Sequence, residues 1–220
     1  MNAPDRALAR ALRLVLVTDG RGDAARLCRL VAAAVDGGLR TVQLREPALP
    51  AADYASLCER LAAILRAVGG VLLLNDRVAA ARAEVAAGVH LGARSMPVAE
   101  ARARLGPAAW IGFSAHDAAE IASAAAQGAD YVSLSPVWPT TCKPGAPALG
   151  LPAALRIAQR APLPVVLLGG IDERRAAELR GRWSGGVAVR SAICEAADPR
   201  PATAALRAAL GLDREVAEPR

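Results

Sequence analysis

The chain has 220 residues, a formal net charge of +6 and 54% hydrophobic residues, while aromatic residues make up only 3%. A chain of this length buries about 70% of the surface that it exposes when unfolded, so one aliphatic core can stabilise it without disulfide bonds. The arginines are spread along the chain, with no run of five and no interleaved aromatic residues, which argues against a nucleic-acid partner.

Short β-rich runs alternate with Ala/Leu/Arg-rich stretches from end to end. The predicted strands cover 12–19, 41–46, 71–76, 88–92, 110–116, 131–137, 164–170 and 186–193. The predicted helices cover 24–36, 52–68, 78–87, 97–105, 117–127, 152–160, 173–181 and 201–210. Eight strand–helix units predict an α/β fold with a parallel sheet, and their number favours a single-domain (β/α)8 TIM barrel. A doubly wound open sheet is the competing architecture, but "TDGRGD" at 18–23 lacks its G-x-G-x-x-G turn.

The barrel domain is expected over residues 12–212, between an N-terminal extension over 1–11 and a flexible polar tail over 213–220. The apolar run near the N-terminus is too short for a signal peptide, and no segment approaches 18 uninterrupted apolar residues. We therefore expect a cytoplasmic protein that does not contact a membrane.

In a TIM barrel the active site lies at the C-terminal ends of the strands. At the end of the second strand, Gln43 and Arg45 are two residues apart and so share one face. A guanidinium beside an amide suits phosphate oxygens. The alternative is that Arg45 only pairs with a carboxylate on a neighbouring strand.

The third and fifth strands end on further polar groups. Asp76, after Asn75, is either a carboxylate for Mg²⁺ or the N-cap of the following segment. His116 follows the fifth strand, with Ser114 on the same face, and histidine exchanges protons near neutral pH. The alternative for His116 is a structural imidazole. A zinc site formed by His90, His116 and Cys142 is conceivable, but their spacing in the sequence does not match a known zinc-ligand pattern.

The loop "PTTCKPG" at 139–145 contains Lys143, the only lysine of the chain. A lysine is a compact, mobile point charge, unlike the planar guanidinium that the sequence uses elsewhere. This contrast predicts that Lys143 serves the chemistry of the site.

The seventh and eighth strands end in "LGGID" and "VRSAI". Barrel enzymes commonly bind a phosphate at this place, through backbone N–H groups of glycine-containing loops. Gly169, Gly170, Arg190 and Ser191 are therefore the predicted phosphate site. A tight turn without a ligand is the alternative.

Several motifs resemble, in order, the thiamine-phosphate synthase and thiazole tautomerase superfamily. They are "VQLRE", "LLLNDR", "GVHLG", "IGFSAHDAAEI", "GADYVSLSPVWPTTCKPG", "PVVLLGGI" and "GVAVRSAI", and the resemblance runs from about residue 12 to 208. It implies a (β/α)8 barrel that binds a thiazole ethyl phosphate, a small-molecule phosphate substrate, as a homodimer. The thiazole phosphate side, at Gly170 and Ser191, matches the family pattern.

The synthase branch joins the thiazole to hydroxymethylpyrimidine diphosphate with Mg²⁺ and displaces the diphosphate. The resemblance implies a Gln-x-Arg-x-Lys pattern, which Gln43 and Arg45 match, but Pro47 stands at the lysine position. The implied Asn-Asp pair matches Asn75 and Asp76, which would make Asp76 the metal ligand.

Two further departures concern the same diphosphate and metal. The second magnesium aspartate of the family falls on Ser95. The Thr-x-Thr-Lys loop matches Thr140 and Lys143, but Cys142 stands at the second threonine. Loss of a lysine charge and a carboxylate should weaken the stabilisation of a departing diphosphate, so little thiamine-phosphate formation is expected.

The expected activity is therefore that of the tautomerase branch, which aromatises a carboxythiazole phosphate by a proton shift and needs no cofactor. The resemblance places the motif histidine at His116, which would act as base and then as acid. Ser114 would orient it, Lys143 would face the substrate carboxylate, and Cys142 is the next candidate proton carrier. The synthase with Mg²⁺ and a non-catalytic thiazole or thiamine phosphate binder remain alternatives.

Overall fold

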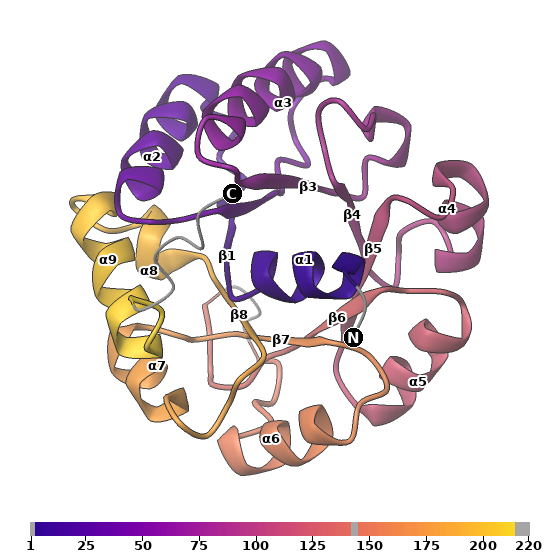
Figure 1. The fold of residues 1–220 in the computed structure, drawn as a ribbon, viewed down its shortest axis with the longest axis vertical. Coiled ribbons are helices and arrows are strands. Elements are labelled where there is room, and N and C mark those ends of the chain that lie inside the picture. Colours follow the sequence, from indigo (N-terminus) through magenta and orange to yellow (C-terminus); the bar gives the residue numbers. More distant parts are fainter. Residues whose placement is uncertain (1–2, 142–144, 214–220) are drawn as a thin grey trace.

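The computed structural model describes residues 3–141 and 145–213. Its eight strands are parallel and form a closed barrel in which each strand pairs with the next and β8 pairs with β1 (Figure 1). The strands are β1 (Leu14–Val17), β2 (Thr41–Leu44), β3 (Val71–Asn75), β4 (Gly88–Leu91), β5 (Trp110–Ala115), β6 (Tyr131–Leu134), β7 (Val165–Leu168) and β8 (Gly186–Val189). The TIM-barrel prediction is confirmed, and the open sheet is excluded.

Helices surround the barrel on its outside (Figure 1). They are α2 (Ala24–Asp36), α3 (Ala51–Arg66), α4 (Val98–Leu105), α5 (Ala118–Ala126), α6 (Leu151–Gln159), α7 (Glu173–Leu179), α8 (Ser191–Cys194) and α9 (Pro199–Leu210), with a 3₁₀ turn, η1, at Val78–Ala80. None of the described helices is long and apolar enough to cross a membrane.

The strands are short apolar runs because both faces of each strand are covered. One face packs on the outer helices, and the other points into the barrel. Of the inward residues, Val15, Val17, Leu73, Tyr131, Val166 and Ala188 form an apolar cluster. Buried polar side chains such as Gln43, His90 and Ser133 interrupt this pattern toward the C-terminal ends of the strands.

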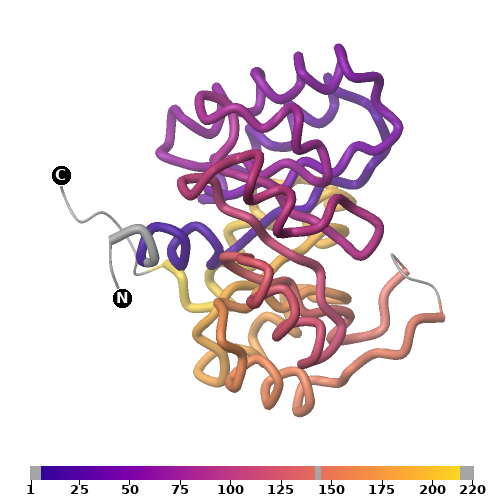
Figure 2. The backbone as a smooth tube through the Cα atoms, turned by 90° about the vertical axis from the view of Figure 1, so that its right-hand side faces the viewer, coloured from indigo at the N-terminus to yellow at the C-terminus, as the bar shows by residue number. Residues whose placement is uncertain are grey.

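The segment 1–11 was expected only as an extension, but Ala3–Ala11 forms helix α1. This helix crosses the opening of the barrel (Figure 1), and Leu8 and Leu12 are 6% and 2% exposed within the interior apolar cluster. Figure 2 shows α1 on one side of the molecule and the described parts of the β6–α6 connection on the other. The N-terminal end of the barrel is thereby closed by apolar side chains, and the opposite end is left for the site.

One predicted element was wrong in kind, and another ends earlier than predicted. The predicted helix over 78–87 is η1 followed by turns, in which Val85 and Ala86 are buried. The predicted strand over 186–193 ends at Val189, and the short helix α8 begins at Ser191. Residues 214–220, most of the predicted tail, lie outside the described residues.

Candidate active site

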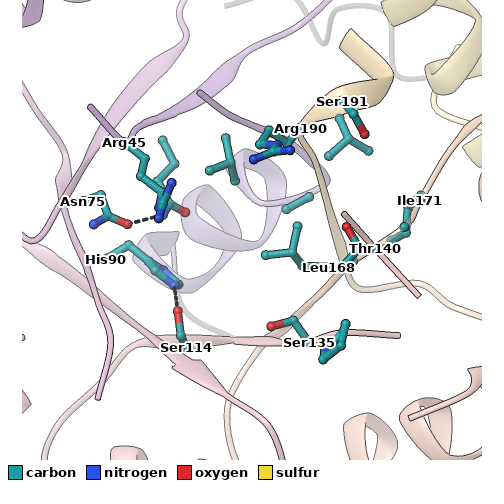
Figure 3. Close-up of a pocket in the computed structure, with 17 residues that line it drawn as sticks. Arg45, Asn75, His90, Ser114, Ser135, Thr140, Leu168, Ile171, Arg190 and Ser191 are labelled. Atoms are coloured by element: carbon teal, nitrogen blue, oxygen red, sulfur yellow. Dashed lines mark hydrogen bonds between the residues drawn. The ribbon is translucent and has the colours of Figure 1, made fainter. Parts of the chain in front are cut away.

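A pocket of about 160 Å³ lies at the C-terminal end of the barrel (Figure 3). Each of the eight strands, or the loop that follows it, contributes at least one lining residue. Nine of the predicted site residues line it: Gln43, Arg45, Asn75, Ser114, Thr140, Gly169, Gly170, Arg190 and Ser191. The remaining lining residues are Val17, His90, Ser135, Pro136, Leu168, Ile171, Ala188 and Val189. The strand-end argument therefore located the pocket correctly.

Gln43 and Asn75 form the polar wall on the β2–β3 side of the pocket. Gln43 Nε2 donates to Asn75 Oδ1 at 3.0 Å, and Asn75 Nδ2 donates to Asp76 Oδ2 at 2.7 Å. Ser95 donates its hydroxyl to Asp76 Oδ1 and accepts the Gly92 N–H at 2.6 Å. These hydrogen bonds fix the orientation of the exposed Asp76 carboxylate relative to the pocket wall.

Asp76 is exposed at the rim and has a φ of 63°, the left-handed region that Asp and Asn tolerate best. It is not the side-chain N-cap of η1, whose N-cap residue, Arg77, makes no side-chain cap bond. Among the described residues no group of three His, Cys, Asp or Glu side chains could hold a metal ion. One carboxylate fits Mg²⁺ where substrate phosphates supply further oxygens, since Mg²⁺ is usually bound by one or two carboxylates plus phosphates.

Arg45 lines the pocket, and no ion pair joins it to a carboxylate in the described part of the chain. Its backbone N–H donates to Thr18 Oγ1 at 2.8 Å. The neighbouring Glu46 is 3% exposed and accepts the backbone N–H groups of Gly20 at 3.0 Å and Gly22 at 2.8 Å. The Glu46 carboxylate is thus hydrogen-bonded to the β1–α2 loop and does not form an ion pair with Arg45. The Arg45 guanidinium can therefore bind an anion in the pocket.

Pro47, which stands at the family's lysine position, contributes its carbonyl oxygen rather than a charge. Arg77 Nη2 lies 3.2 Å from Pro47 O and 2.9 Å from Leu49 O, and the guanidinium carbon lies 4.8 Å from the centre of the Tyr54 ring. Arg77 therefore fastens the β2–α3 loop.

The opposite wall contains the two glycines after β7. Gly169 and Gly170 have φ values of 107° and 65°, and a Cβ on Gly170 would lie 2.6 Å from Pro139 O. Glycine is required here because the β6–α6 and β7–α7 connections approach each other closely. Arg175 Nη1 donates to Gly170 O and its guanidinium stacks on the Trp138 ring. The turn is tight and also faces the pocket, so the two interpretations of the sequence are compatible.

Arg190 and Ser191 complete this wall (Figure 3). The Arg190 side chain is 23% exposed, and its Nη2 lies 3.9 Å from Glu195 Oε1, the outer limit of an ion pair. Its buried Nε has no hydrogen-bond partner among the described residues. A partly buried guanidinium with unused donors indicates a place for an anionic ligand.

His90 is the main residue that the sequence analysis missed, since it was considered only for zinc. It is 3% exposed and lines the pocket floor, where Nε2 lies 3.0 Å from Ser114 Oγ and 3.2 Å from Ser133 Oγ. Burial lowers the pKa of His90 to about 4, so the ring is neutral at pH 7. Its signal in the sequence was its place near the C-terminal end of a predicted apolar strand.

His116 does not line the pocket. Its side chain is 45% exposed, and Nδ1 lies 2.9 Å from Glu120 Oε2, which also accepts the His116 backbone N–H at 2.8 Å. Asp117 in turn accepts the Glu120 N–H at 2.8 Å as the N-cap of α5. "HDAAE" thus forms a helix cap that resembles a capping box. Cys142 and Lys143 lie outside the described residues.

The chain is similar to known proteins along nearly its whole length. The family model described as thiamine monophosphate synthase matches residues 14–193. The thiamine-phosphate synthase of Mycobacterium bovis is 38% identical over 209 residues, which cover 90% of this chain and 94% of the relative. That of Albidiferax ferrireducens is 40% identical over 199 residues, covering 90% and 91%. The solved structure of thiamine phosphate pyrophosphorylase from Pyrococcus furiosus, 32% identical, superimposes with a TM-score of 0.84 and covers 93% of this chain and 98% of that one.

These findings correct the expected activity. The prediction of a thiazole tautomerase was wrong, since relatives named thiamine-phosphate synthase match at 38–40% identity over about 90% of the chain. The expectation that no cofactor is needed depended on the tautomerase prediction and is not supported either. The proton shift that gave His116 a catalytic role is likewise no longer expected. The prediction gave too much weight to Pro47, Ser95 and Cys142, although one carboxylate with substrate phosphates can suffice for Mg²⁺. The chain belongs to the thiamine monophosphate synthase family.

Proposed function

We propose that the protein is a thiamine-phosphate synthase, which joins hydroxymethylpyrimidine diphosphate to thiazole phosphate and releases diphosphate. The observation that carries the proposal is one pocket with anion-binding groups on two sides. Arg45 and Asn75 lie on one side, and Arg190 and Ser191 lie on the other (Figure 3). Two phosphorylated substrates that react with each other fit such an arrangement.

The thiazole phosphate is assigned to the wall formed by Gly170, Arg190 and Ser191. Loops after the seventh and eighth strands are where barrel enzymes commonly bind phosphate. The Arg190 guanidinium adds a positive charge with a donor that no described residue uses.

The diphosphate is assigned to the side of Arg45 and Asn75. Asp76, oriented by Asn75 and Ser95, would hold Mg²⁺ together with oxygens of the diphosphate. When bound there, the metal would offset negative charge on the leaving group. That Lys143 serves the chemistry of the site remains a prediction, as does the homodimer that the resemblance implies.

The reaction needs charge stabilisation more than proton transfer. The thiazole nitrogen forms a bond to the exocyclic carbon of the pyrimidine, the bond from that carbon to the diphosphate oxygen breaks, and the diphosphate leaves with the electron pair. Arg45 can stabilise the charge that collects on the leaving oxygen.

The test is turnover with both substrates and Mg²⁺, with thiamine phosphate measured by chromatography. Arg45→Ala should lower the rate by about 10²–10³, the usual effect of removing one electrostatic donor, while Arg60→Ala on the exposed face of α3 is the matched control. Exchange of ring protons of carboxythiazole phosphate in heavy water is measured in parallel. Binding of both substrates without any product would identify a non-catalytic binder instead.

A further inference from the structure

The His90 ring lies between the apolar interior of the barrel and the pocket. On the interior side, Nδ1 is 3.1 Å from the hydroxyl of Tyr131. On the pocket side, Nε2 is 3.0 Å from Ser114 Oγ, as the dashed line in Figure 3 shows. The ring therefore connects a phenol that no ligand can reach to a serine that lines the pocket.

The Tyr131 hydroxyl lies in surroundings that offer few hydrogen-bond acceptors. The residue is 2% exposed and belongs to the apolar cluster with Leu8, Leu12 and Val166. The bond with His90 Nδ1 is the only one that the described part of the chain gives its hydroxyl. Burial raises the pKa of the phenol, so it keeps its proton, and that proton needs an acceptor.

A neutral imidazole has one donor and one acceptor nitrogen, and each bond therefore determines the other. If Nδ1 carried the proton, the Tyr131 O–H would be left in apolar surroundings without an acceptor. The phenol O–H is confined to the ring plane, whereas the hydroxyls of Ser114 and Ser133 rotate freely about their Cβ–Oγ bonds. The serines can adapt to either form of the ring, and the tyrosine cannot.

We infer that Tyr131 donates to His90 Nδ1, that His90 donates from Nε2 to Ser114, and that Ser114 consequently directs its own proton into the pocket. Tyr131 and His90 are then positioning residues that act through Ser114. With one lone pair of Oγ used by His90, the serine presents its O–H as a donor for an acceptor atom of the ligand.

The inference rests on the proposed function for the identity of the acceptor, which is an anionic oxygen of the diphosphate. The low pKa of His90 is consistent with it, because a ring that stays neutral near pH 7 keeps a defined direction of donation. The hydrogen-bonding groups that face the ring are Tyr131, Ser114 and Ser133, and no carboxylate is among them.

The direction of donation can be measured without any substrate. The chain has only two histidines, so a protein labelled with ¹⁵N-histidine gives two imidazole patterns, and His116→Gln assigns them. We expect His90 to show a protonated Nε2 and an unprotonated Nδ1 from pH 6 to 8. A protonated Nδ1, or a mixture of the two forms, overturns the inference whatever the enzyme catalyses.

The consequence for binding is tested with Tyr131→Phe, and the only other tyrosine provides a matched control. Tyr54 is 1% exposed and donates to Leu44 O at 3.1 Å, away from the pocket lining, so Tyr54→Phe also removes one buried phenol bond. Binding of inorganic diphosphate with Mg²⁺ and of thiazole phosphate is measured by calorimetry for both variants.

We expect Tyr131→Phe to weaken diphosphate binding about three- to tenfold and to leave thiazole phosphate binding within twofold, while Tyr54→Phe changes neither. An equal loss for both ligands would show a structural role, and no loss for either would remove the role of Tyr131 in orienting Ser114. If the parent protein binds no diphosphate at all, the proposed function fails, and the ¹⁵N measurement still decides the direction of donation.

Discussion

Ser95 donates its hydroxyl to Asp76 at the rim of the pocket, at the position where the family resemblance implied a second carboxylate. Because the Gly92 N–H donates to Ser95 Oγ, the serine proton is directed toward Asp76. The two side chains therefore lie in contact, as two metal ligands would, but they carry one negative charge instead of two.

Ser95→Asp should accordingly strengthen Mg²⁺ or Mn²⁺ binding to the free protein by about tenfold or more, since a second carboxylate adds both charge and an oxygen ligand. Titration calorimetry with metal alone measures this. Ser95→Ala is the control and should not tighten binding. An unchanged affinity in Ser95→Asp would mean that the metal is held elsewhere.

Arg190 is expected to distinguish phosphorylated from unphosphorylated thiazole. Arg190→Ala should weaken thiazole phosphate binding by about 10- to 100-fold, the range for loss of a charge-assisted hydrogen bond, and should leave binding of the thiazole alcohol nearly unchanged. Arg190→Lys should recover part of the loss. The exposed Arg182, eight residues earlier, serves as the control through Arg182→Ala. Equal losses for both ligands would point to a distorted β8 end instead of a lost charge.

The barrel could be predicted from the sequence because parallel strands buried on both faces are apolar runs of four to six residues between amphipathic helices. The segment 78–87 was predicted as a helix because Ala and Arg have high helix propensity. In the structure this connection between β3 and β4 instead places Val78, Val85 and Ala86 in the core, and tertiary packing overrides propensity.

The site could be predicted in part. Arg45, Asn75, Gly170 and Ser191 stand at strand ends, and strand ends meet at one mouth. His90 also stands near the end of a predicted strand, but a lone histidine in an apolar strand does not indicate a role, and it was considered only for zinc. His116 was misassigned, although the Asp117–Glu120 spacing of a helix cap was visible in the sequence.

The buried His90 should make the protein less stable in mild acid. The pKa of His90 in the folded protein is about 4, below the ordinary value of 6.5. Between these two values the unfolded chain binds a proton at His90 and the folded protein does not. The free energy of unfolding should therefore fall as the pH falls from 6.5 toward 4, by about 2 kcal/mol between pH 7 and 5 from this group alone.

Urea unfolding at pH 7 and pH 5 measures the effect, and His90→Gln should lose about that much of the pH dependence. His116→Gln removes the exposed histidine and is the control, in which the contribution of His90 should remain. If His90→Gln keeps the full pH dependence of the parent, the native ring is already charged at pH 5 and the neutral assignment is wrong.

The last prediction separates the need for space at Gly170 from the need for its backbone conformation. Gly170 and Gly181 have φ values of 65° and 72°, but a Cβ on Gly170 would meet Pro139 O at 2.6 Å, whereas a Cβ on Gly181 would meet nothing within 4 Å. Gly181→Ala should then cost only the strain of a left-handed alanine, about 1–2 kcal/mol of unfolding free energy. Gly170→Ala should cost more, because the β6–α6 connection must move. It should also reduce thiazole phosphate binding by tenfold or more, about the effect of one lost hydrogen bond to a charged group.

Thermal unfolding and calorimetry with thiazole phosphate give both quantities. Equal destabilisation of the two variants, with phosphate binding intact in Gly170→Ala, would show that the turn is needed for folding only and that the phosphate binds elsewhere in the pocket.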